Sequence, residues 1–323
     1  MSSETRAPGS RTDHAGDSRL PLRSLLFVPG NRTEWLPKAE ASGADAAILD
    51  LEDAVAEADK PAACAEVGEA VASRAESSES TGRMALFVRI NPLGSWTAAE
   101  ELRAVAGPGL AGVLLPKVSD EEDVRFADRL LSWCEREEDL PLGSIALVPL
   151  LESALSLRSA YEIGAAASRV AYLGALTGAG GDVERAVGYR WSPEGSETLA
   201  LRSRVLLDVR ASGAPHPVTG LWTHIDDLDG LRHFAEQNRS LGYTGMMAIH
   251  PSHVPVINEV FSPGADELDR CRRLVATVRE AQLRGAGAVT FEGRMVDEAM
   301  ATTAQQTLDL EQRRRRTARG PSA

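Results

Sequence analysis

Short, continuous apolar runs recur along the chain and are separated by longer, Ala-rich amphipathic stretches. Unbroken apolar runs are typical of parallel strands that are covered on both faces, whereas half-exposed strands alternate. The runs predict strands at 24–28, 46–51, 85–90, 112–115, 145–150, 170–173 and 246–249, and a less regular one between 215 and 225. The stretches between them predict helices, among them 60–74, 120–135, 155–167, 197–211 and 228–241.

Eight strand–helix units within about 240 residues favour an α/β fold of the (β/α)8 type, a TIM barrel, over an open sheet or two domains. We expect this catalytic barrel at 21–260. After Ile257 the pattern changes to a helix at 267–284, a glycine breaker, an extended segment at 289–291 and a helix at 297–310. Residues 261–310 are too few for a large core of their own. They predict a C-terminal helical extension that packs on the barrel, on a neighbouring subunit or on both.

The two ends of the chain have compositions that do not predict packed structure. Residues 1–20 are rich in Ser, Arg, Gly and Asp without periodicity, and 311–323 form a basic tail, so we expect both to be disordered. The formal net charge of −12 argues against a nucleic-acid partner. No apolar run approaches the ~18 residues of a membrane helix, and the first 20 residues lack a secretory signal. The expected protein is soluble and cytoplasmic.

Polar side chains follow the predicted strands closely. The residues are Asn31 and Arg32, Glu52 and Asp53, Arg89 and Asn91, Lys117, Glu152, Asp182, and His250. The carboxyl ends of barrel strands form one rim, where such enzymes place their active sites. Structural roles are open for several of them: Glu52 and Asp53 could cap a helix, Arg89 could pair with Glu52 or Glu152, and Lys117 could serve the fold alone.

Glu152 and Asp182 form the most specific pair. Carboxylates on adjacent strand ends, without His or Cys nearby, are the ligands that a hard divalent cation takes. Mg²⁺ keeps waters or substrate oxygens beside one or two carboxylates, so two protein ligands suffice. The glycine-rich loop at 178–181 lets the backbone approach a ligand closely. This loop is not a P-loop, because no Lys-Ser/Thr follows it.

Eight motifs, in order along the chain, carry a family resemblance. They are RSLLFVPGN (23–31), ILDLEDAV (48–55), VRINP (88–92), LLPKV (114–118), PLLESA (149–154), GDVERAVG (181–188), GYTGMMAIHP (242–251) and FEGRMVDEA (291–299). Together they resemble the citrate lyase beta-subunit-like branch of the HpcH/HpaI aldolase superfamily, which includes citramalyl-CoA and malyl-CoA lyases and malate synthase-like enzymes. The motifs cover nearly the whole expected ordered chain.

The resemblance implies an activity and an assembly. The activity is a Mg²⁺-dependent, reversible carbon–carbon cleavage of a 3-hydroxyacyl-CoA thioester, such as malyl-, methylmalyl- or citramalyl-CoA, into an acyl-CoA and a 2-oxo acid. Mn²⁺ is an alternative metal, and coenzyme A is part of the substrate. The implied assembly is a homotrimer or hexamer in which the C-terminal extension acts as a lid over a neighbouring subunit's barrel. The alternatives are a (3S)-malyl-CoA-type thioesterase on the same scaffold and a carrier-dependent subunit like the citrate lyase beta chain.

Catalytic and metal roles follow residue by residue from the matching motifs. Glu152 and Asp182 are the implied magnesium ligands. Arg89 is implied to hold the carboxylate or oxo group of the substrate with its fork of donors. Asp297, in the lid motif, is implied to be the carboxylate that moves the proton at the α-carbon of the thioester.

Binding roles follow in the same way. Lys38 and Phe27 match positions that contact coenzyme A. Glu52 matches an acidic position on the substrate side that orders the water shell of the metal, and Gly181 lies where the backbone approaches the substrate. The chain departs from the family pattern in a longer loop before Asp182 and in Thr219, which stands where an Asp is common.

Overall fold

The structure is a computed structural model that describes residues 21–76 and 84–319, so the expected disordered leader at 1–20 lies outside the described residues. The strands of the barrel are β1 (Ser24–Pro29), β2 (Ala46–Asp50), β3 (Ala85–Arg89), β4 (Gly112–Leu115), β5 (Ala146–Pro149), β6 (Tyr172–Leu173), β7 (His216–Thr219) and β8 (Gly245–Ala248). The helices that follow them are α1 (Leu36–Ala41), α2 (Lys60–Glu76), α3 (Trp96–Val105), α4 (Glu121–Glu137), α5 (Ala154–Arg158), α6 (Ala160–Ala165), α7 (Asp182–Val187), α8 (Leu199–Ser212), α9 (Leu228–Leu241) and α10 (His253–Val260).

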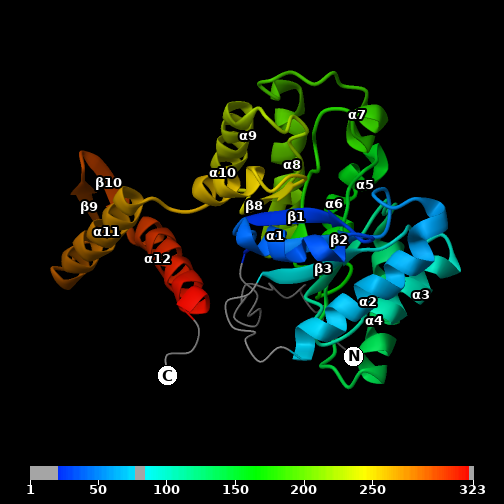
Figure 1. Ribbon diagram of the computed structural model, residues 1–323. Coiled ribbons are helices and arrows are strands. Elements are labelled where there is room, and N and C mark those ends of the chain that lie inside the picture. The colour runs from blue at the N-terminus through cyan, green and yellow to red at the C-terminus, as the bar shows by residue number, and fades with distance from the viewer. Residues whose placement is uncertain (1–20, 77–83, 320–323) are drawn as a thin grey trace, which may run out of the picture.

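The eight strands are parallel and form a barrel (Figure 1). Hydrogen bonds link them in the order β5-β4-β3-β2-β1-β8-β7-β6. The ring is closed between β5 and β6 by two isolated parallel bridges, Leu147 to Val170 and Leu151 to Ala175. The expected TIM barrel is therefore confirmed.

Two apolar layers explain why the strands appear in the sequence as unbroken apolar runs. Leu25, Ile48, Phe87 and Leu114 belong to a cluster that fills the barrel interior, and the residue after each one belongs to the larger cluster between strands and helices. Both faces of each strand are thus buried, as in other parallel barrels. Gly112 makes room for this packing, because a Cβ at that position would lie 2.4 Å from the Phe87 ring.

The C-terminal extension is a separate small layer. It consists of α11 (Ala265–Leu283), the antiparallel strands β9 (Ala288–Phe291) and β10 (Arg294–Asp297), and α12 (Glu298–Arg319). Its own apolar cluster includes Leu274, Phe291 and Val296. In Figure 1 the extension projects from the barrel on the side opposite α5 and α7, with the β9–β10 hairpin at its outer end.

The extension corrects two expectations from the sequence. Asp297 ends a strand instead of beginning a helix, and α12 continues to Arg319 where a disordered tail was expected from residue 311. Tertiary contacts explain the longer helix: Arg314 donates to the carbonyl oxygens of Phe261 (3.3 Å) and Pro21 (3.2 Å). These contacts join α12 to the amino-terminal end of the barrel, because Pro21 precedes β1.

No helix in the described part of the chain is both long enough and apolar enough to cross a membrane.

Candidate active site

An ion network occupies the carboxyl ends of β2 and β3. Arg89, the last residue of β3, donates from Nε and Nη2 to the two carboxylate oxygens of Asp50, at 2.7 Å each. Its third nitrogen, Nη1, lies 3.0 Å from Glu52 Oε2. Asp50 and Glu52 are almost completely buried, at 1% and 3% exposed. Their charges require cationic partners in the interior, which fixes the orientation of the guanidinium.

Lys117 extends this network to β4 and β5. Its ammonium nitrogen lies 2.7 Å from Glu52 Oε1, and its backbone N–H donates to Glu152 Oε2 at 2.8 Å. Glu152 follows β5 and is the expected metal ligand. Its carboxylate is therefore placed beside the ion network through the backbone of the preceding strand end.

Glu152 has a strongly altered acidity. Burial raises the pKa of Glu152 to about 7, and the negative charges of Glu52 and Asp182 act in the same direction. The Lys117 N–H and the charge of Arg89 act in the opposite direction and are too weak to offset the burial. The anionic form of a carboxylic acid with a pKa this high is stabilised when a cation binds beside it.

Asp182 lies at the start of α7, after the glycine-rich loop. Gly181 precedes it in an extended conformation, and Gly180 has a positive φ of 72°. Glu184 accepts hydrogen bonds from the backbone N–H groups of Gly180 and Trp191, which joins the glycine-rich loop before α7 to the segment after it. Asp182 itself is paired with the exposed Arg185 at 2.5 Å.

The two carboxylates fit a divalent metal that receives its other ligands from water or substrate. Among the described residues, no group of three or more His, Cys, Asp and Glu side chains forms a complete metal site. Glu152 follows β5, and Asp182 lies after the neighbouring strand β6, so both belong to the same part of the rim. The negative charge of Asp182 also contributes to the raised pKa of Glu152. Two partly buried carboxylates match the coordination that Mg²⁺ commonly takes.

The two residues expected to contact coenzyme A, Phe27 and Lys38, have different surroundings in the structure. Phe27 lies on β1 and packs against the interior cluster, and the Arg89 guanidinium lies 4.9 Å from its ring centre. Its ring therefore supports Arg89 through a cation–π contact. Lys38 is exposed on α1, which follows β1 at the rim. Gly181 is also exposed.

Asp297 is not part of this rim in its own chain. It lies on β10, where its Oδ1 accepts from the backbone N–H of Met300 at 3.2 Å. The hairpin and the helices α5 and α7, which begin near Glu152 and Asp182, lie at opposite sides of the molecule in Figure 1. A single chain thus brings together Arg89, Glu52, Glu152 and Asp182, and leaves Asp297 apart.

The sequence places Asp50 among the polar residues at the end of a strand but indicates no role for it; in the structure it accepts from two of the three nitrogens of Arg89. In the sequence it ends an apolar run and looks like an ordinary strand terminus. Its two-residue spacing from Glu52 is the one signal available, because alternate residues of a strand share a face.

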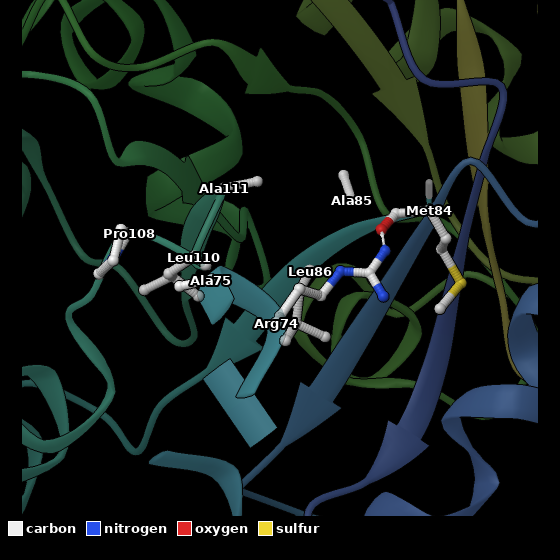
Figure 2. A pocket seen from close by; sticks show the side chains of 9 residues that line it. Arg74, Ala75, Met84, Ala85, Leu86, Pro108, Leu110 and Ala111 are labelled. Atoms are coloured by element: carbon white, nitrogen blue, oxygen red, sulfur yellow. Dashed lines mark hydrogen bonds between the residues drawn. The ribbon is translucent and has the colours of Figure 1, made fainter. Parts of the chain in front are cut away.

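A cavity of about 350 Å³ lies elsewhere in the barrel. Its walls come from the amino-terminal ends of β3 and β4 and from α2, and Figure 2 shows Arg74 reaching the Met84 carbonyl across it. TIM-barrel chemistry takes place at the other end of the strands. We therefore place the active site at the rim and not in this cavity.

Comparison with known proteins agrees with this arrangement. The profile of the HpcH/HpaI aldolase/citrate lyase family matches residues 23–251. A citrate lyase subunit beta-like protein of Deinococcus radiodurans is 35% identical over 290 residues, which are 90% of this chain and 97% of the relative. A (3S)-malyl-CoA thioesterase of Cereibacter sphaeroides is 33% identical over 291 residues, covering 89% of this chain and 94% of the relative.

A solved structure shows the same overall form. The protein CitE of Mycobacterium tuberculosis, in complex with magnesium, acetoacetate and coenzyme A, superposes with a TM-score of 0.68 at 30% identity. The match covers 90% of this chain and 98% of CitE. At the level of the family, these relatives confirm the expectation of an enzyme of the CoA-ester lyase type that uses magnesium and coenzyme A. The chain belongs to the HpcH/HpaI aldolase/citrate lyase family.

Proposed function

We propose that this protein is a Mg²⁺-dependent lyase that cleaves the carbon–carbon bond of a 3-hydroxyacyl-CoA thioester, giving an acyl-CoA and a 2-oxo acid. The observation that carries the proposal is the rim itself. Two metal-type carboxylates, Glu152 and Asp182, follow the neighbouring strands β5 and β6. Glu152 is joined through Lys117 and Glu52 to the ion network that fixes Arg89. Membership in the family and the likeness to a CitE bound to magnesium, acetoacetate and coenzyme A support it.

Glu152 and Asp182 would hold the metal. When bound, Mg²⁺ supplies Lewis-acid polarisation of the oxo group of the acid. The chain contributes the fixed ligand geometry, since the N–H of Lys117 occupies Glu152 Oε2 and leaves Oε1 for coordination. Glu52 forms ion pairs with both cations of the network, Arg89 and Lys117, and holds them beside the metal ligands.

Arg89 would bind the carboxylate of the 2-oxo acid, although not through the Nε–Nη2 edge that Asp50 occupies. Nη1 also lies 3.0 Å from Glu52 Oε2. The substrate carboxylate would therefore meet the N–H groups of the two terminal nitrogens that these carboxylates leave, together with the fixed positive charge. Lys38, exposed near the rim, would bind a phosphate of coenzyme A.

Asp297 would move the proton at the α-carbon of the acyl group, as base in condensation and as acid in cleavage. Because it lies apart from the rim of its own chain, it would come from a neighbouring subunit of a homotrimer or hexamer. Its arrival would also cover the mouth and exclude water from the enolate.

Thioester hydrolysis is the second candidate, because a relative that is 33% identical is a (3S)-malyl-CoA thioesterase. The same rim would serve it, with water attacking the thioester carbonyl in place of carbon–carbon cleavage. A carrier-dependent role like that of the citrate lyase beta chain is less well supported, since this chain possesses the extension that carries Asp297.

The reaction can be tested with purified protein, Mg²⁺ and a panel of malyl-, methylmalyl- and citramalyl-CoA, followed by mass spectrometry with and without EDTA. We expect an acyl-CoA and a 2-oxo acid from one member of the panel, and no product with EDTA, because the oxo group needs the metal. Free coenzyme A with an intact hydroxy acid would establish the thioesterase instead. Survival of every ester would contradict both activities.

Metal binding should depend on pH through Glu152. The pKa of Glu152 is raised to about 7, so its proton competes with the metal below neutrality. We expect the Mg²⁺ affinity measured by calorimetry to rise up to about tenfold per pH unit between pH 5.5 and 7, and to level off above pH 8. The isosteric variant Glu152→Gln should bind more weakly and lose this pH dependence. An affinity that is constant from pH 5.5 to 8.5 in the wild type would contradict the assignment.

Asp297 from one subunit should complete the barrel of another. Glu152→Gln and Asp297→Asn should each abolish turnover, whereas an equimolar mixture of the two variants, reassembled together, should regain about a quarter of wild-type activity, the share of all sites with an intact barrel and an intact hairpin under random mixing. The matched control mixes Glu152→Gln with Asp182→Asn, whose lesions both lie in the barrel, and should stay inactive. If the first mixture also stays inactive although mass spectrometry shows hybrid assemblies, Asp297 does not act between subunits.

A further inference from the structure

Lys117 has a backbone conformation that side-chain-bearing residues rarely adopt. Its φ is +53°, in the left-handed region. Two other non-glycine residues in the described part of the chain have positive φ values, Asp139 (52°) and Glu292 (50°). Asp139 follows the end of α4, and Glu292 forms the turn of the β9–β10 hairpin, so both belong to ordinary surface turns. Lys117 instead lies at the rim, between β4 and α4.

Strain of this kind persists where surrounding contacts hold it, and the contacts of Lys117 are specific. The ammonium lies 2.7 Å from the buried Glu52, and the backbone N–H of the same residue donates to Glu152 Oε2 at 2.8 Å. Glu52 is fixed in turn by Arg89, at 3.0 Å. One residue therefore reaches a buried anion with its side chain and a different carboxylate with its backbone.

We propose that Lys117 is a positioning residue for the metal ligand: its ammonium, paired with Glu52, holds the backbone in the left-handed conformation in which its N–H orients the Glu152 carboxylate. This inference rests on the proposed function only in taking Glu152 as a metal ligand. The Lys117 side chain thus acts on Glu152 indirectly, through its own backbone, and this role explains the strained conformation of Lys117.

Glycine and alanine separate this role from an ordinary ion pair. Lys117→Gly removes the ammonium but lets the backbone keep a positive φ without strain. Lys117→Ala removes the same charge and has a Cβ, so the unanchored backbone should relax and withdraw the N–H from Glu152. The loss of one positive charge near the metal is common to both variants and cancels in their comparison.

The experiment is a titration of the full-length variants with Mn²⁺, which accepts the same oxygen ligands as Mg²⁺, with the free ion followed by electron paramagnetic resonance. Circular dichroism shows that each variant is folded. We expect Lys117→Gly to bind Mn²⁺ within about twofold of the wild type, and Lys117→Ala to bind about tenfold more weakly than Lys117→Gly. Lys117→Arg should recover part of the affinity lost in Lys117→Ala, because it restores a cation opposite Glu52.

The matched control uses Asp139, which has nearly the same φ and lies outside the ion network. Asp139→Gly and Asp139→Ala should bind Mn²⁺ equally. Equal affinities of Lys117→Gly and Lys117→Ala, whether both unchanged or both weakened, would overturn the positioning role. A wild type that binds no Mn²⁺, or a Glu152→Gln variant that binds as tightly as the wild type, would overturn the metal assignment of the proposed function and this inference with it.

Discussion

Two buried carboxylates and two cations hold the carboxyl ends of three neighbouring strands together. Asp50 ends β2 and Glu52 follows it, Arg89 ends β3, and Lys117 follows β4. The contacts that join these four side chains are 3.0 Å or shorter. Charges removed from water are costly unless each has a partner in good geometry, so these side chains have little freedom to move. The orientation of Arg89 and the unusual backbone of Lys117 both depend on this mutual neutralisation.

The network leaves Glu152 and Asp182 as the acids that it does not neutralise. Glu152 is buried enough to have a pKa of about 7, and the only cation that pairs with Asp182 among the described contacts is the exposed Arg185. A divalent cation held by these two carboxylates would complete the charge balance of the rim. The core inside the barrel is apolar, as in other barrels of this type, so the polar groups available for chemistry lie at the rim. The extension that carries Asp297 is attached at the opposite, amino-terminal end of the barrel.

Sequence reasoning succeeded where a local pattern determines the structure. The helix predicted at 228–241 has the same bounds as α9, because an amphipathic stretch lies between the cap Asp227 and Gly242. It failed where distant contacts decide. The strand β10 has two exposed residues and no clear alternation, and α12 extends past residue 311 because Arg314 binds carbonyls on the barrel. The rim residues could be proposed as a group because each follows a strand in the sequence. The pairing of Arg89 with Asp50 and the strained backbone of Lys117 arise from the packing of three strands, which no local pattern predicts.

The central claim, that the rim breaks a carbon–carbon bond next to a thioester, can be tested most directly by running the cleavage in D₂O. A lyase generates an enolate of the acyl-CoA that must take a proton from an exchangeable acid, so mass spectrometry should find one deuterium on the α-carbon of the released acyl-CoA. An acyl-CoA without deuterium, or free coenzyme A beside an unlabelled hydroxy acid, would contradict the account.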